Sequence, residues 1–147
     1  MSLKDRIQED MKAAMRSGAK ERLGTIRLIL AAIKQREVDE RITLDDAQVT
    51  NVLEKMVKQR RESVTQFQSG GRADLAAKEN AELEIVSAYL PVQLSPAELD
   101  ALIAEAIKET GAASIKDMGK VMNLIKSKAQ GRADMAAVGA RIKARLA

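Results

Sequence analysis

The chain contains neither cysteine nor histidine among its 147 residues. Without cysteine there is no disulfide framework and no thiolate nucleophile. Without either residue, Ser-His and Cys-His catalytic arrangements and the usual zinc hydrolase sites are excluded. A carboxylate pair or a Ser-Lys dyad stays open, although no P-loop, G-x-S-x-G or G-x-G-x-x-G motif accompanies either one. We therefore expect no independent enzymatic activity, no cofactor and no bound metal.

Aromatic residues and long apolar runs are also scarce. Phe67 and Tyr89 are the only two aromatic residues, although 46% of the chain is hydrophobic. An apolar content made of Leu, Ile, Val, Ala and Met favours helices packed on helices. No run of about 18 apolar residues is present, and the first residues are charged, so neither a membrane span nor an export signal is predicted. These absences lead us to expect a cytoplasmic protein.

Seven helices are predicted from apolar periodicity and capping residues. Their approximate ranges are 3–17, 20–40, 43–68, 74–89, 96–109, 114–128 and 134–146. The third is predicted to begin at Thr43 with Asp46 completing its cap, and the sixth at Ser114. Gly131 is predicted to end the sixth helix, and Asp134 to cap the seventh.

The two prolines, Pro91 and Pro96, mark a boundary in this helical pattern. Proline disfavours helix in the residue before it, so the fourth helix is expected to end by Leu90. Ser95, Pro96 and Glu98 together form a strong helix start. The sequence thus predicts an all-α protein with an N-terminal bundle of about four helices (residues 1–91) and a small three-helix domain (residues 92–147).

Positive charge is concentrated at the C-terminal end of the chain. Residues 110–147 carry 8 basic and 2 acidic residues, a net charge of +6. Residues 1–91 have 16 basic and 15 acidic residues (+1), and residues 92–109 have 1 basic and 4 acidic residues (−3). An excess of this kind is the electrostatic signature of a site for a polyanion.

A glycine lies among these charges, in a segment with helical periodicity. Gly119 has Lys116 and Lys120 beside it, so a phosphate backbone could approach the bare peptide chain closely there. The alternative for Gly119 is a close helix–helix contact, and the alternative for the lysines is a solvated helix face. Aromatic platforms for stacking bases are missing, so recognition of a folded RNA by shape fits better than base reading. The candidate RNA-binding residues are Lys116, Gly119, Lys120, Asn123, Lys126, Lys128 and Arg132.

Two residues of the N-terminal half are predicted to have structural roles. Arg60 continues the apolar row of the third helix, and a buried arginine needs a carboxylate partner. Glu79, Glu82 and Glu84 are the candidates for that partner. Tyr89 is predicted to pack at the domain junction, with its hydroxyl holding the linker.

The chain resembles the YqeY-like family, and it is similar to the tail region of GatB, a subunit of the tRNA-dependent amidotransferase. The resemblance covers nearly the whole chain. It is carried by residues 89–91 (Tyr-Leu-Pro) and 93–95 (Gln-Leu-Ser), by 119–122 (Gly-Lys-Val-Met) and 131–134 (Gly-Arg-Ala-Asp), and in the first half by Arg27, 31–34 (Ala-Ala-Ile-Lys) and 58–62 (Lys-Gln-Arg-Arg-Glu).

This resemblance implies an all-α protein related to a tRNA-contacting tail domain. The family-level activity would be carbon–nitrogen ligation with glutamine as amido-N-donor, but the chain lacks the amidotransferase's other parts and is not expected to catalyse alone. The resulting hypothesis is an RNA-binding module, with tRNA as the expected partner. The alternative is an adaptor that docks on a translation or amidotransferase protein.

Overall fold

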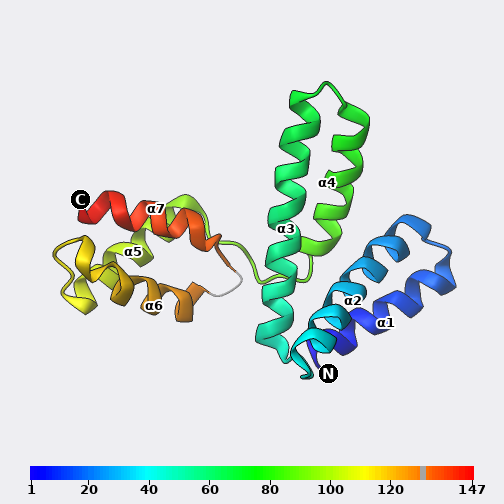
Figure 1. Ribbon diagram of the computed structural model, residues 1–147, viewed down its shortest axis with the longest axis horizontal. Coiled ribbons are helices and arrows are strands. Elements are labelled where there is room, and N and C mark those ends of the chain that lie inside the picture. Colours follow the sequence, from blue (N-terminus) through cyan, green and yellow to red (C-terminus); the bar gives the residue numbers. More distant parts are fainter. Residues whose placement is uncertain (130–131) are drawn as a thin grey trace. The chain divides into compact units, whose positions relative to one another are not determined.

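The computed structural model describes residues 1–129 and 132–147. In this part of the chain there are seven α-helices, one short 3-10 helix and no β-strand (Figure 1). The all-α prediction is therefore confirmed. The chain divides into two compact units, Met1–Leu90 and Pro91–Ala147. No helix within the described residues combines the length and the apolar character that crossing a bilayer requires.

The first unit consists of two helical hairpins. One hairpin joins α1 (Leu3–Ser17) to α2 (Lys20–Glu40), and the other joins α3 (Asp46–Ser69) to α4 (Ala73–Ser87), with α2 also contacting α3 and α4 (Figure 1). Helix α1 begins at a capping box between Ser2 and Asp5 and ends at Gly18, whose φ of 72° is the left-handed conformation that glycine adopts readily. Local sequence therefore determines both ends of this helix.

The start of α3 differs from the prediction of Thr43 with Asp46. Asp45 is the N-cap, and its carboxylate accepts a hydrogen bond from the Gln48 backbone at 2.8 Å while the Gln48 side chain caps in return. Asp46 instead accepts a hydrogen bond from the Leu3 backbone N–H at 2.9 Å. The prediction was wrong because Asp46 is used for a contact with α1, which periodicity alone does not reveal.

The core of the first unit gathers β-branched and leucine side chains from all four helices. Those with no more than 1% exposure are Ile7, Ile26, Ile29, Ile33, Val49, Leu53 and Val86. Each such side chain contributes about 1.5–3 kcal/mol by leaving water. This core is the main source of stability for the four-helix unit.

Tyr89 belongs to this core and does not hold the linker. It is 5% exposed, its hydroxyl donates to Asp10 Oδ2 at 2.5 Å, and Arg6 lies over its ring at 5.2 Å. Burial and the neighbouring Asp10 carboxylate raise the pKa of Tyr89 to about 12. The predicted role was wrong because the hydroxyl partner comes from α1, 79 positions away in the sequence.

Glu37, near the end of α2, joins three segments of the first unit. Its carboxylate accepts the Leu44 backbone N–H at 2.9 Å and the Lys4 ammonium at 2.9 Å. These bonds, with that of Leu44 the larger cause, hold the pKa of Glu37 below its ordinary value of 4.5. Glu37 thereby fixes the loop that leads from α2 into α3.

The lowered pKa of Glu37 predicts a specific acid sensitivity. A carboxylate with a depressed folded-state pKa adds stability above its unfolded pKa and loses it as the pH falls through the folded value. Glu37→Gln is expected to lower the urea midpoint of unfolding at about pH 7. The difference in urea midpoint between this variant and the unsubstituted protein is expected to shrink below pH 4.5. A difference in urea midpoint that stays constant down to about pH 3 would show that Glu37 has no role in acid unfolding.

Arg60 on α3 pairs with Glu82 on α4, as the sequence predicted. Arg60 Nε lies 3.3 Å from Glu82 Oε2, and the two side chains are 12% and 18% exposed. The contact is an ion pair, but the Arg60 Nε–H does not point at the carboxylate well enough to form a hydrogen bond. It replaces an apolar contact in the seam between the two helices.

The second unit is a three-helix domain made of α5 (Pro96–Thr110), α6 (Met118–Ala129) and α7 (Met135–Leu146). Ser95 and Glu98 form the predicted capping box ahead of Pro96, and the Asp134 side chain caps α7 by accepting the Ala136 N–H. Gly131, predicted to end the sixth helix, lies outside the described residues. The fully buried side chains, at 0% exposure, are Ile103, Val121, Ile125, Ala129, Val138 and Ile142.

The predicted sixth helix begins later than Ser114. Residues Ile115–Asp117 form a 3-10 turn, η1, and Ser114 makes no side-chain cap bond. Asp117 instead folds back, and its carboxylate accepts the Ala113 N–H at 3.0 Å. Because α6 begins only at Met118, Gly119 lies in the first turn of this helix and not in a helix interior.

Candidate nucleic-acid interface

The outer side of η1 and α6 gathers most of the candidate residues on one face. Lys116 lies on η1, and Lys120, Asn123 and Lys126 follow on α6, all four exposed. On a helix, residues three and four positions apart are neighbours, so this spacing places them along one strip. The opposite side of α6 carries the buried core residues Val121, Ile125 and Ala129. We call the exposed strip, with Gly119, the α6 face.

Gly119 is exposed on this strip, and a Cβ at this position would meet no atom within 4 Å in the described structure. The alternative of a close helix–helix contact at Gly119 is therefore wrong. Such a contact occurs at Gly139 on α7 instead, where a Cβ would lie 3.6 Å from Met118 Cε. Gly119 leaves its backbone open to an approaching molecule.

Lys128 and Arg132 are placed differently from the other candidates. Lys128 Nζ lies 3.5 Å from the Glu109 carboxylate on α5. Arg132 is half-buried, and its Nε donates to the Val92 carbonyl oxygen at 3.0 Å. Arg132 thus organises the segment that precedes α5. Sequence reasoning missed both contacts because each joins positions far apart in the chain.

One acidic side chain lies close to the α6 face. Asp117 has a lowered pKa, chiefly because its carboxylate accepts the Ala113 N–H, with a smaller contribution from the charge of Lys120. No side-chain ion pair or hydrogen bond within the described residues engages Lys116, Lys120 or Lys126. Their positive charge therefore remains available to an external anion.

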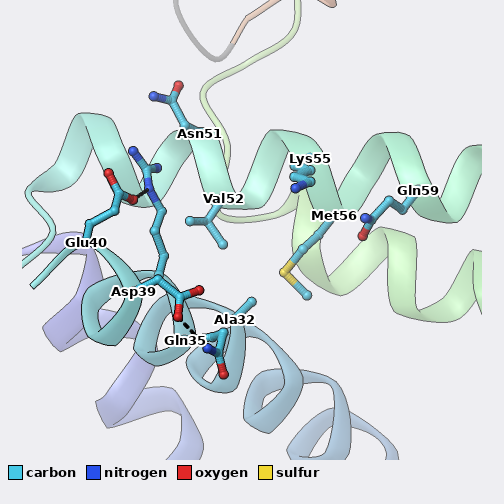
Figure 2. Close-up of a pocket in the computed structure, with 10 residues that line it drawn as sticks. Ala32, Gln35, Asp39, Glu40, Asn51, Val52, Lys55, Met56 and Gln59 are labelled. Carbon is cyan, nitrogen blue, oxygen red and sulfur yellow. Dashed lines mark hydrogen bonds and ion pairs between the residues drawn. The ribbon is translucent and has the colours of Figure 1, made fainter.

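The first unit carries a different hollow, an open groove of about 640 Å³ between α2 and α3. Val52 and Met56 of α3 point toward Ala32 and Gln35 of α2 across it (Figure 2). Its rim is polar, and no three acidic, cysteine or histidine side chains of the described chain come together as a metal site. The groove therefore combines an apolar wall with charged side chains at its edge, Asp39, Glu40 and Lys55 among them.

Curated relatives of this chain are identical to it at about a third of the aligned positions. A protein of Pyrenophora tritici-repentis is 34% identical over 130 residues, covering 84% of this chain and 71% of the relative. A protein of Eremothecium gossypii is 38% identical over 101 residues, covering 68% and 55% respectively. A third, from Lachancea thermotolerans, is 35% identical over 107 residues, covering 70% and 57%. The chain thus spans little more than half the length of the last two.

All three relatives are named "Altered inheritance of mitochondria protein 41, mitochondrial". The expectation of a cytoplasmic protein is contradicted by these names and was wrong. It depended on the lack of an apolar export signal and of cysteine. Neither feature bears on mitochondrial import, because transit peptides are amphipathic and arginine-rich and not continuously apolar.

The helical fold and the sequence similarity agree with a match at the level of the family. The family model described as "Yqey-like protein" matches residues 4–146, nearly the full length of the chain. The match includes both helical units and the whole α6 face. The chain belongs to the YqeY-like family.

Proposed function

We propose that this protein binds folded RNA, with tRNA as the first candidate, through the α6 face. The observation that carries the proposal is the strip of exposed lysines around Gly119, Lys116 and Lys120 above all, with no side-chain partner in the described structure. A chain segment with a net charge of +6 supplies the surrounding positive potential. Lysines of this kind bind phosphates and release the counterions condensed on the nucleic acid.

The mode of binding is recognition of the sugar–phosphate backbone. Residues 91–147 contain no aromatic side chain, so they offer no platform for stacking unpaired bases. Asn123, on the same strip as the lysines, adds a neutral donor and acceptor for a phosphate or a 2′-hydroxyl group. The protein contributes binding and no independent catalysis, so any glutamine-dependent carbon–nitrogen ligation would need other proteins.

Titration of labelled tRNA with the full chain at several salt concentrations tests this proposal. We expect measurable affinity at low salt that falls steeply as salt rises, because the interaction replaces bound counterions. Double-stranded RNA of similar length should compete better than an unstructured single strand, because no aromatic side chain stacks bases. Absence of binding at low salt, or an affinity indifferent to salt, would contradict the proposal.

Gly119→Ala separates folding from binding at this face. The new methyl group has open space and the φ of Gly119 is not left-handed, so the free energy of unfolding should rise by up to about 1 kcal/mol. The same methyl group would keep a phosphate away from the backbone, and we expect tRNA affinity to fall about fivefold. Thermal unfolding and tRNA titration measure the two effects.

Gly24→Ala is the matched control for this substitution. Gly24 is also an exposed helical glycine at which an added Cβ would meet nothing within 4 Å, but it lies on α2 in the first unit. Because Gly24 lies in a helix interior, its replacement should bring a gain in stability at least as large, of about 1 kcal/mol, with no change in tRNA affinity. Equal tRNA affinities for the two variants would remove Gly119 from the proposed contact.

A protein partner on the same face is the second candidate. Ile115 is 46% exposed beside Lys116, and an exposed apolar side chain among cations suits a protein surface better than RNA. The partner would be a translation or amidotransferase component. Nuclease treatment distinguishes the two, because an adaptor complex survives it and an RNA-mediated complex does not.

A further inference from the structure

The solvent side of α2 carries an apolar strip that the first unit does not use. On the helix the strip runs through Gly24, Leu28, Ala31, the polar Gln35 and Val38, at alternating steps of four and three residues. Ile42 follows the end of α2 and lines a pocket together with Val38. Leu28 is 47% exposed, Val38 60% and Ile42 40%, and these are three of the seven large hydrophobic side chains exposed in the described chain. Steps of four and three are the spacing of a coiled-coil seam. We call this strip the α2 seam.

A row of cations runs along one edge of the α2 seam. Lys20, Arg27 and Lys34 recur every seven residues on α2, and Arg41, the left-handed C-cap of the helix, follows seven residues later. All four are exposed. Seven residues span about 10 Å along a helix axis, so the row has the repeat of a second helix lying alongside. Lys34 and Arg41 also line a shallow pocket of about 320 Å³ with Val38 and Ile42. This pocket places the end of the row beside the end of the seam.

The acids of α2 do not neutralise the row. Glu37 is bonded to Lys4 and the Leu44 backbone, Asp39 accepts from Gln35, and Glu40 pairs with Arg36. Glu21, in the first turn of α2, makes no ion pair within the described residues. Lys34 makes only a minor electrostatic contribution to the lowered pKa of Glu37. Within the described residues, no side-chain hydrogen bond or ion pair engages any of the four cations. Their charge is therefore left for a partner.

Small residues and a neighbouring groove make the α2 seam suitable for close contact. Gly24 and Ala31 leave the backbone of α2 near the surface, and a Cβ at Gly24 would meet nothing within 4 Å. A glycine inside a helix costs about 1 kcal/mol relative to alanine, and no contact within the described chain explains this one. Gln35 lies at the edge of the α2–α3 groove, whose apolar side is formed by Val52 and Met56 (Figure 2).

We propose that the α2 seam docks an acidic amphipathic helix of a partner protein. Apolar side chains of that helix would pack on Leu28 and Val38 and reach into the α2–α3 groove. Carboxylates spaced seven residues apart would lie along the cation row. This is the helix-in-groove mode of recognition, in which apolar anchors give affinity and flanking charges give orientation.

A second copy of this chain fits the α2 seam poorly. In an antiparallel pairing the cation row would face itself, which is repulsive. In a parallel pairing the cation row of one copy would face positions 25, 32 and 39 of the other copy. Thr25 is buried, Ala32 is uncharged, and Asp39 already accepts a hydrogen bond from Gln35. Only an acidic partner supplies the complementary charge along the whole row.

The test uses the full chain and a labelled synthetic peptide of three heptads, with leucine at positions a and d and glutamate at e and g. We expect saturable binding by fluorescence anisotropy. Arg27→Glu/Lys34→Glu should weaken it at least about tenfold, since two attractions become repulsions. The control Lys58→Glu/Arg61→Glu makes the same change in net charge at exposed positions of α3, and it should alter the affinity by less than about twofold.

Two further variants separate docking from general attraction and from misfolding. Leu28→Asp/Val38→Asp should abolish binding and lower the melting temperature only slightly, because the two side chains are 47% and 60% exposed and the loss is mainly one of helix propensity at Leu28. Gly24→Gln should raise helix stability yet weaken binding, because its side chain fills the bare strip. Lys116→Glu/Lys120→Glu should leave peptide binding unchanged, so failure here is distinct from failure of the RNA proposal.

Several results would overturn the α2 proposal. One such result is that a peptide with lysine in place of glutamate binds as tightly as the acidic peptide. Another is that Arg27→Glu/Lys34→Glu and the control Lys58→Glu/Arg61→Glu weaken peptide binding by the same factor. Self-association that Leu28→Asp/Val38→Asp abolishes would make a second copy the occupant. Loss of tRNA affinity in Arg27→Glu/Lys34→Glu, with peptide binding unchanged, would assign the row to RNA.

Discussion

Glu82→Ala is expected to lower the free energy of unfolding of the first unit by about 2–3 kcal/mol. The substitution leaves the Arg60 guanidinium, 12% exposed, in the α3–α4 seam without its carboxylate. An uncompensated charge in such a place costs more than the ion pair itself contributes. This value is below the roughly 3–5 kcal/mol typical of fully buried pairs, because the Arg60 and Glu82 side chains retain 12% and 18% exposure.

Urea unfolding followed by tyrosine fluorescence measures this loss of stability, because the signal comes from the first unit. Tyr89 is the single tyrosine of the chain and lies in the core of the first unit. The control is Arg60→Met/Glu82→Leu, which removes both charges and should be close to neutral, since apolar side chains of similar volume fill the seam. If the double variant were as unstable as Glu82→Ala, the loss would come from packing and not from an orphaned charge.

Lys116→Glu/Lys120→Glu is expected to weaken tRNA binding by more than about tenfold at moderate salt. Both side chains are exposed on the α6 face, so the reversal should leave the melting temperature nearly unchanged. Each substitution removes a phosphate contact and adds a repulsion. The effect should therefore exceed that of a neutral substitution at the same positions.

Lys143→Glu/Arg145→Glu is the matched control for the α6 variant. These two residues are exposed on α7, belong to the same unit and produce the same change in net charge. We expect a smaller loss of tRNA affinity from this pair. Equal losses would mean that the overall charge of the unit, and not the α6 face, attracts the RNA.

Local sequence predicted the helical architecture well, because short-range interactions decide where helices begin and end. The Ser95–Glu98 capping box lies within four residues and was read directly from the chain. Arg60 was predicted to need a carboxylate because it interrupts an apolar row, and Glu82 provides it. The errors at Asp46 and Tyr89 arose from contacts with α1, at separations of 43 and 79 positions.

The candidate site was predictable to the extent that charge and helical spacing determine exposure. Lys116, Lys120 and Asn123 lie on the exposed side as the periodicity indicated. Lys128 and Arg132 have the same residue types but make contacts within the second unit. Sequence spacing does not show which cations have internal partners, since those partners lie 19 and 40 positions away.

Binding of RNA phosphates by the α6 face is tested by the salt dependence of tRNA binding, measured for the unsubstituted chain and for Lys116→Glu/Lys120→Glu. A plot of log affinity against log salt should be linear, with a slope set by the number of phosphates neutralised. We expect a slope shallower by roughly 1.5 to 2 in the variant, corresponding to two lost phosphate contacts. Identical slopes for the two proteins, or a flat line for the unsubstituted chain, would contradict this expectation.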